Sequence, residues 1–252
     1  MDRLDRDARA FMARVTTPPR HDPRRIAPAL AEATRTHIET SSGRVATWRL
    51  GEGPAVILAH GWSTDNSTWE PLIRALASRG RAVVAVDHPG HGLSADAHCT
   101  RRSAGAALAQ VAEALGPISA AAGHSFGGPV IGLALSQGMP ASRVAFIAPA
   151  PARSKRWLRF AADVGVAPEI AEHALVIAER EGEMFDMSVP GPHMGRPALF
   201  VQSKDDPVAT YESTASLSAA WAGSEMMLVD GLGHERVLAD KAVVERVADF
   251  LA

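Results

Sequence analysis

Short apolar segments alternate with helical segments through most of the chain, and this alternation limits the fold more than any other feature of the sequence. The apolar segments read AVILAH, RAVVAVD, ISAAAG, RVAFIA, ALFVQ and EMMLVD. Apolar runs of this length are typical of parallel strands that are buried on both faces of a sheet. The pattern therefore predicts an α/β fold with a mostly parallel central sheet flanked by helices.

The strand–helix rhythm is absent from two parts of the chain. Residues 1–43 hold an amphipathic helix and a proline-rich linker, so we expect the main domain to span residues 44–252. Within it, residues 149–197 contain two helical segments with no strand between them, which predicts a small helical cap inserted late in the chain. The apolar face of the N-terminal helix carries Leu4, Ala8, Phe11 and Val15. This helix could dock on its own domain, and either it or the cap could form the contact of a homodimer.

Composition excludes several classes of function. The 252 residues are 46% hydrophobic, which suits one domain with a sizeable core. A net charge of -2 gives no reason to expect a nucleic-acid partner. No apolar run approaches the roughly 18 residues of a membrane span. The single cysteine cannot form an internal disulfide, and the first residues lack the apolar core of a secretory signal. We therefore expect a cytoplasmic protein without a membrane partner.

One serine stands in the otherwise apolar stretch SAAAGHSFGGPVIGLAL. Gly123, Ser125 and Gly127 fit the pattern G-x-S-x-G between a predicted strand and a predicted helix. In that setting the chain turns sharply at the serine, and the turn exposes its hydroxyl at the edge of the sheet. Ser125 is therefore a candidate nucleophile. The backbone N–H of Phe126, at the start of the helix, is a candidate donor to a substrate oxyanion.

A serine nucleophile needs a base and a carboxylate that orients the base. His234 follows a predicted strand in VDGLGHERVL, and Asp205 and Asp206 follow another in VQSKDDPVAT. The carboxyl ends of parallel strands lie at one edge of a sheet, so we expect these residues to meet Ser125 there. Neighbouring side chains leave an extended segment in different directions, so only one of the two aspartates can reach His234.

Five motifs together resemble the α/β-hydrolases: HGW, DHPGHGLS, GHSFGG, DDPV and GLGHERVL. The resemblance covers the chain from about Arg44 to its C-terminus, in the family order of serine, acid and histidine. It implies that Ser125 is the nucleophile, His234 the base and Asp206 the acid. Asp206 fits better than its neighbour because the family's acid precedes one residue and then an apolar one. The segment QSK departs from the glycine-bearing lead-in that is usual in the family.

The resemblance also implies a second oxyanion donor, the backbone N–H of Trp62, whose side chain could form a wall of the substrate pocket. The expected activity is hydrolysis of a small carboxylic ester through an acyl-enzyme, with no cofactor. The same triad could instead cleave a thioester, a lactone or a carbon–carbon bond, and a peroxidation side reaction is also open. A different class of function is a non-catalytic receptor for a small ligand, which would bind or react once without turnover.

Other polar residues near these motifs have simpler interpretations. His60 and His124 flank the site, where they could line the pocket but more simply hold loops. Asp87, His88 and His91 resemble metal ligands only superficially, because no further cluster completes a first shell, and we expect no metal. Asp87 is better explained as a hydrogen-bonding group of a turn. Cys99 has no nearby candidate base and is expected to be unreactive.

The predicted cap has an apolar and a basic side. Its first helix aligns Trp157, Phe160, Ala161 and Val164 on one face. Trp157 and Phe160 could pack the cap onto the core or line the substrate pocket. The other face carries Arg153, Lys155, Arg156 and Arg159. A basic face of this kind is usually solvated, but it could also attract an anionic substrate.

Overall fold

The computed structural model describes residues 2–20, 25–151 and 156–252. Its strands are β1 Thr34–Thr40, β2 Gly43–Leu50, β3 Ala55–Ala59, β4 Ala82–Val86, β5 Ile118–His124, β6 Arg143–Ile147, β7 Ala198–Ser203 and β8 Ser224–Val229. Its α-helices are α1 Arg3–Val15, α2 Glu70–Ser78, α3 Arg101–Leu115, α4 Gly127–Ser136, α5 Arg156–Asp163, α6 Pro168–Arg180, α7 Tyr211–Ala220 and α8 Lys241–Leu251. Short 3₁₀ turns occupy Pro28–Leu30, Asn66–Trp69 and Arg236–Leu238.

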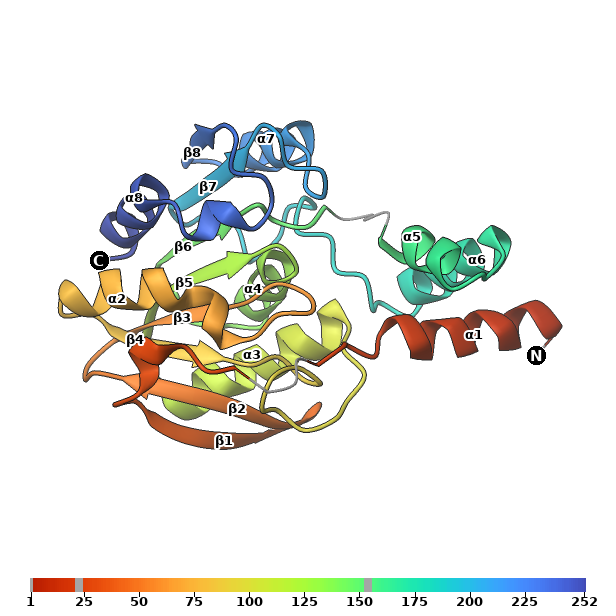
Figure 1. Cartoon of the computed structure of the whole chain (residues 1–252), viewed down its shortest axis with the longest axis horizontal. Helices are drawn as coiled ribbons and strands as arrows, with labels where there is room; N and C mark the ends of the chain where they lie inside the picture. The colour runs from red at the N-terminus through yellow and green to blue at the C-terminus, as the bar shows by residue number, and fades with distance from the viewer. Residues whose placement is uncertain (1, 21–24, 152–155) are drawn as a thin grey trace.

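One eight-stranded sheet forms the centre of the molecule (Figure 1), with strand order β1-β2-β4-β3-β5-β6-β7-β8. Strand β1 pairs antiparallel with β2, and β2 antiparallel with β4. All later pairings, from β4 across to β8, are parallel. The predicted α/β fold with a mostly parallel sheet is therefore confirmed. The carboxyl ends of β3, β5, β7 and β8 lie at one edge, where the candidate residues follow them.

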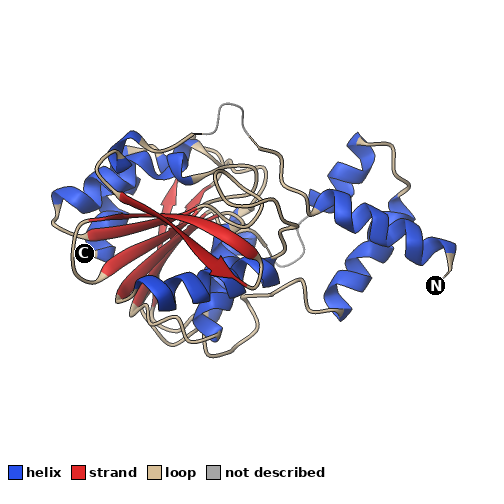
Figure 2. Cartoon of the chain, turned by 90° about the horizontal axis from the view of Figure 1, so that it is seen from below, coloured by secondary structure: helices blue, strands red, loops and turns tan. Residues whose placement is uncertain are grey.

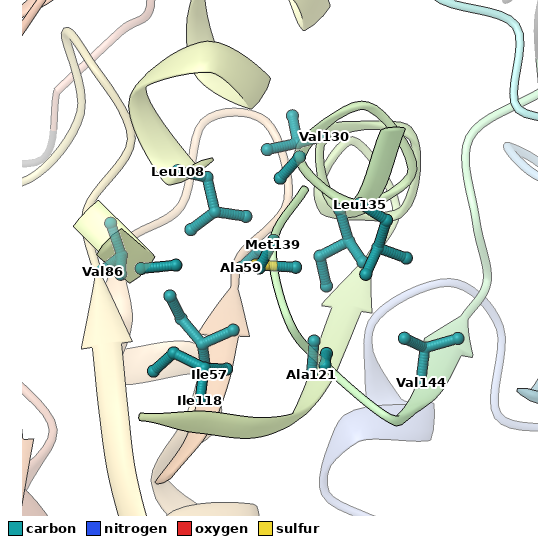
Figure 3. Packing of buried hydrophobic residues seen from close by; sticks show 14 of the residues in the cluster. Ile57, Ala59, Val86, Leu108, Ile118, Ala121, Val130, Leu135, Met139 and Val144 are labelled. Carbon is teal, nitrogen blue, oxygen red and sulfur yellow. The ribbon is translucent and has the colours of Figure 1, made fainter. Parts of the chain in front are cut away.

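Helices cover both faces of this sheet (Figure 2). On one face, buried side chains of α3, α4 and α7 form a single cluster with the strands. Figure 3 shows part of it, with Leu108 of α3 and Val130 of α4 above Ile57 and Ala121 of the sheet. On the other face, α2 and α8 pack over side chains of the opposite parity, including Val56. Burial on both faces explains why the central strands read as continuous apolar runs.

Two elements of the structure were not expected from the sequence. Strand β1 lies within residues 1–43, the part assigned to a helix and linker, and it pairs with β2 along its whole length. Its sequence TRTHIET holds one large apolar residue, Ile38, because an edge strand needs little apolar surface. Helix α7 reads YESTASLSAA, whose many serines and threonines hide its helical period. The predicted boundary between residues 1–43 and the main domain of residues 44–252 stays a prediction.

The late insertion contains two helices, α5 and α6, as the sequence predicts. Helix α1 lies beside them, and the three helices form a layer to one side of the sheet (Figure 1). The shared apolar cluster includes Ala8, Phe11 and Val15 of α1, all buried. The N-terminal helix therefore docks its apolar face on the cap of its own chain. Residues 21–24 of the predicted linker, and Arg153 and Lys155 of the basic face, lie outside the described residues.

Within the described ranges, no helix combines the length and the apolar content that a membrane crossing needs.

Candidate active site

A strained turn between β5 and α4 presents Ser125. Its φ of +49° lies in the left-handed region, which residues with a side chain rarely adopt, and its N–H donates to the carbonyl of Ile147 at 3.0 Å. The glycines on either side are sterically required. A Cβ atom on Gly127 would lie 2.0 Å from the carbonyl oxygen of Ala59, and one on Gly123 would lie 2.6 Å from that of Gly127. The motif GHSFGG therefore folds as the sharp turn that its spacing predicts.

Three side chains from separate strand ends form one hydrogen-bonded chain at this turn. His234 Nε2 lies 2.9 Å from Ser125 Oγ, and His234 Nδ1 lies 2.7 Å from Asp206 Oδ2. Asp206 and Ser125 are both buried, and the His234 side chain is only 13% exposed. The structure thus brings together the three residues that the sequence analysis selected, although they are far apart in the chain.

The environment of Asp206 favours a carboxylate. Burial acts to raise its pKa, but the hydrogen bond and charge of His234 and the backbone N–H groups of Val208 and Ala209 outweigh that effect. The pKa of Asp206 therefore lies below its ordinary value. An ionised carboxylate can only accept, so His234 carries its proton on Nδ1 and offers Nε2 as an acceptor to the Ser125 hydroxyl.

Asp205 has a different set of partners from its neighbour. It accepts hydrogen bonds from the hydroxyl of Ser203 and, at 3.0 Å, from the backbone N–H of Gly233. These hydrogen bonds, the one from Ser203 first, lower the pKa of Asp205. Asp205 thus ties the strand end to the loop of His234, whereas Asp206 contacts the imidazole itself. This division agrees with the choice of Asp206 made from the motif DDPV.

The two expected oxyanion donors come from the ends of two different strands. Phe126 directly precedes helix α4, and Trp62 follows β3 in the loop after Gly61. Their rings meet edge to face, with centroids 5.3 Å apart. Among the hydrogen bonds of residues 2–20, 25–151 and 156–252, the backbone N–H groups of Trp62 and Phe126 have no acceptor. Both groups are therefore available to a substrate oxygen.

A cavity of about 700 Å³ opens beside Ser125, between the strand ends and the cap. Its walls include Trp62 and Phe126 from the strand ends, and Trp157 and Phe160 from the first cap helix. The two aromatic residues of the cap thus line the cavity, and they pack against Phe11 of α1 in the cluster that α1 shares with α5 and α6. The cap completes the cavity rather than lying apart from it.

His60 and His124 are buried and lie outside the described cavity lining. His60 Nδ1–H donates to the carbonyl of Gly61, and its Nε2 accepts from the backbone N–H of His88 at 3.0 Å. His124 Nε2–H donates to the carbonyl of His234 at 2.9 Å and so fixes the loop that carries the base. Burial lowers the pKa of His124 to about 4, so its ring is neutral near pH 7. Both histidines hold loops.

The turn DHPGHGLS is organised around Asp87. Its carboxylate accepts from the backbone and side-chain amides of Asn66 at 2.8 and 3.0 Å, and from the N–H of Leu93 at 2.8 Å. His88 Nε2–H donates to the carbonyl of His60, and His91 Nδ1–H donates to that of Pro89. Asp87 therefore acts as the predicted hydrogen-bonding centre of the turn. In the described residues no cluster of three or more potential ligands could hold a metal ion.

Three features of the cavity were missed from the sequence. Cys99, which the sequence did not assign to the cavity, is buried at its wall, and burial raises the pKa of the thiol well above the ordinary value. Arg156, assigned to the basic face of the cap, lines the cavity next to Trp62. The residues after α1, including Thr16, also line it. The amphipathic pattern of α1 was the one available signal, since it showed that this helix must cover something.

The sequence profile of the alpha/beta hydrolase family matches residues 56–249, most of the chain. The chain therefore belongs to the alpha/beta hydrolase family. The match begins at β3 and includes every residue of the hydrogen-bonded chain Ser125–His234–Asp206.

The sequence similarity to individual proteins covers only part of the chain. Two similar proteins are named pimeloyl-[acyl-carrier protein] methyl ester esterase. The one from Nitrosomonas europaea is 31% identical to this chain over 121 residues, and the one from Nitrosospira multiformis is 34% identical over 113 residues. These regions cover 48% and 42% of this chain, and the chain spans 43% of the length of each relative. An esterase structure from Pyrococcus furiosus has a TM-score of 0.71 at 17% identity, over 94% of this chain and 96% of that one. That likeness concerns the fold.

Proposed function

We propose that this protein is a serine hydrolase that cleaves small carboxylic esters through Ser125, His234 and Asp206. The observation that carries the proposal is the continuous hydrogen-bonded chain from the Ser125 hydroxyl to the Asp206 carboxylate, at 2.9 and 2.7 Å. The strained backbone of Ser125 supports it, because strain at a buried polar residue is typical of functional sites.

In the proposed first step, Ser125 Oγ attacks the ester carbonyl and gives its proton to His234 Nε2. The imidazolium that forms keeps its Nδ1–H bonded to Asp206, whose negative charge stabilises it. The carbonyl oxygen becomes an oxyanion, which the backbone N–H groups of Trp62 and Phe126 can bind. His234 then protonates the leaving alcohol, and an acyl-Ser125 ester remains.

In the second step, a water molecule gives a proton to His234 and attacks the acyl carbon. The second oxyanion uses the same N–H groups. When it collapses, the bond to Ser125 Oγ breaks, the serine regains its proton from His234, and the carboxylic acid leaves. Every proton transfer in these steps involves a side chain of this protein or water.

Two considerations favour an ester as the substrate. The relatives from Nitrosomonas europaea and Nitrosospira multiformis are named for hydrolysis of a methyl ester, and their matches support the same bond type here. The cavity wall is rich in aromatic side chains, including Trp62, Phe126 and Phe160, which suits the apolar carbon chain of an acyl group.

The test combines a fluorophosphonate probe with p-nitrophenyl esters of increasing acyl length. We expect the probe to label Ser125 and the enzyme to turn over many times. Ser125→Ala removes the nucleophile and should lower kcat by on the order of 10³ to 10⁶ without unfolding the chain. Ser136→Ala, the same change at the far end of α4, is the matched control and should keep wild-type activity.

Two outcomes would contradict the proposal. Ester turnover by Ser125→Ala within tenfold of wild type would show that another group is the nucleophile. A single burst of p-nitrophenol without further turnover would instead favour a receptor that reacts once. Circular dichroism of both variants shows whether a lost activity reflects lost folding.

A further inference from the structure

The cavity beside Ser125 carries an excess of positive charge. Among the described residues, its lining includes four arginines and one aspartate, together with His234 and Cys99. Arg101 is almost fully buried and donates to the carbonyls of Phe185 and Pro151, so it ties the cap to the core. Arg159 reaches the carbonyl of Pro207 only at 3.4 Å. Arg156, the first residue of α5, contacts Trp62, which carries one of the proposed oxyanion donors.

Arg156 is held in a defined position. Its guanidinium lies over the ring of Trp62, with the Cζ atom 4.1 Å from the ring centroid. On its other side, Nη1 and Nη2 donate to the carbonyl of Val15, at the C-terminal end of α1, at 3.3 and 3.2 Å. Cations are favoured at that end of a helix, and stacking on an aromatic ring stabilises them further. Trp62 also carries one of the two proposed oxyanion donors.

Among the described residues, the hydrogen bonds of Arg156 leave most of its N–H donors without an acceptor. A guanidinium has five N–H donors, and the carbonyl of Val15 takes one from each terminal nitrogen. In the described parts of the chain, Arg156 forms no ion pair with a carboxylate. Burial lowers the pKa of Arg156 to about 10, so the group remains a cation at neutral pH. A partly buried cation with free donors in a cavity is suited to bind an anion.

We propose that Arg156 is a specificity-determining residue that binds a carboxylate of the substrate, so that the preferred substrates are small esters bearing a second, free carboxylate. This inference rests on the proposed ester hydrolysis and narrows its substrate class. The carboxylate would accept the free N–H donors of Arg156 while the ester carbonyl lies between Ser125 and the N–H groups of Trp62 and Phe126. The carboxylate can belong to the acyl part, as in a half-ester of a dicarboxylic acid, or to the alcohol part, as in an O-acyl hydroxy acid.

The first experiment compares substrates that differ in one charge. Monomethyl esters of dicarboxylic acids from glutarate to suberate are set against their dimethyl esters, and O-acetyl hydroxy acids against their methyl esters. We expect wild-type kcat/KM to be at least about tenfold higher for the charged member of one of the two sets. Arg156→Gln should reduce that preference by on the order of tenfold or more, because it removes a charge-assisted hydrogen bond. The set that shows the effect identifies the part of the substrate that Arg156 binds.

A control variant makes the same change elsewhere in the cap. Arg180 is exposed at the end of α6 and is not among the cavity residues. Arg180→Gln alters the net charge of the cap equally and should leave the preference for charged esters as in the wild type. An equal loss in both variants would mean that the general field of the cap, rather than Arg156, attracts anions.

A binding measurement keeps the inference separate from turnover. In the Ser125→Ala background, calorimetry with the preferred half-ester should give a Kd that rises about tenfold or more on Arg156→Gln. Absence of fluorophosphonate labelling at Ser125 in the wild type would overturn the ester hydrolysis while leaving this binding result intact. Labelling and turnover with equal rates for charged and neutral esters, unchanged by Arg156→Gln, would overturn the carboxylate site alone.

Discussion

Asp205 and Asp206 leave the same strand end, and the structure gives them separate tasks. Asp206 accepts from His234 Nδ1 at 2.7 Å, whereas Asp205 accepts from the backbone N–H of Gly233. Asp206→Asn should lower kcat by roughly 10⁴, because it removes the charge that orients and stabilises the imidazolium. Asp205→Asn should weaken a loop contact of about 1 kcal/mol and keep most of the activity. The measurement is kcat of both variants on one activated ester.

The reverse ranking of these two variants would place the acid one residue earlier than the motif DDPV indicates. If neither variant lost activity, the proposed role of Asp206 as the acid would be wrong. Circular dichroism is again the control, since a loop that fails to close could mimic the loss of the acid.

Asp87 provides a prediction on stability and pH. Burial raises its pKa to about 6 in the folded protein, against the hydrogen bonds from Leu93 and Asn66, which act to lower it. An unfolded aspartate titrates near ~3.9. Because the folded pKa is the higher one, the stabilising contribution of Asp87 is full below about pH 4 and is lost as the pH rises through about 6.

Relative to Asp87→Asn, the wild type should therefore lose unfolding free energy on the order of 3 kcal/mol between about pH 4 and pH 7. Urea denaturation of both proteins across this range measures the difference. Parallel curves for the two proteins would mean that folding does not raise the pKa of Asp87.

At the level of single residues, the sequence predicted the positions of side chains that directly follow strands. Ser125, Asp206 and His234 each follow an apolar run, so parallel-strand geometry placed them together before any contact was known. The place of Arg156 could not be predicted in this way. It depends on α5 lying against Trp62 and the end of α1, and those contacts join segments far apart in the sequence.

At the level of elements, helix α1 is part of the substrate cavity as well as of the cap. Its apolar face packs on α5 and α6, and residues at its C-terminal end, among them Val15, line the cavity. The period of its apolar residues predicted a docked helix. The sequence left its partner open, because a covered face on the same chain and a dimer contact produce the same pattern.

Phe11→Ala tests this role of α1. Phe11 is 3% exposed and contacts the rings of Trp157 and Phe160, so its truncation should destabilise the packing of α1 by about 3 kcal/mol. We expect faster hydrogen exchange in α1 and α6, unchanged exchange in the central strands, and a higher KM. Leu4→Ala on the same helix is the control, because Leu4 is 38% exposed. Equal effects of both changes would contradict a specific docking contact.

The elements that the sequence missed share a physical cause. Strand β1 is paired at the edge of the sheet, and its neighbours hide little of it, so its residues need not be apolar. Helix α7 buries only Thr214 and Leu217. The buried strands and the helices with a wide apolar face were visible because burial selects apolar residues. Elements that bury few side chains show only a weak hydrophobic pattern in the sequence.

At the level of the whole molecule, hydrogen bonds join the cap to the core, and the cavity beside Ser125 is already open. Arg9 pairs with Glu181 at 2.7 Å, and His173 Nε2 forms a hydrogen bond with Asp5 at 2.6 Å; the two contacts join α1 to α6 and the turn after it. Arg101 of α3 binds the carbonyls of Phe185 and Pro151 at the two ends of the insertion. The cavity of about 700 Å³ beside Ser125 therefore needs no lid movement to form.

This arrangement predicts a preference for short and medium acyl groups and no activation at a lipid surface. Enzymes that are activated at interfaces must move a lid to expose the site, whereas here Arg101 of α3 binds two carbonyls of the insertion and the cavity beside Ser125 is already open. With p-nitrophenyl esters, kcat/KM should fall at least tenfold between the best medium-length acyl chain and palmitate. With tributyrin, the rate should follow a simple saturation curve through the solubility limit. A sharp rise in rate above that limit would show that the cap opens on a lipid surface, and the hydrogen bonds of Arg101 to the insertion would then be the first contacts to examine by substitution.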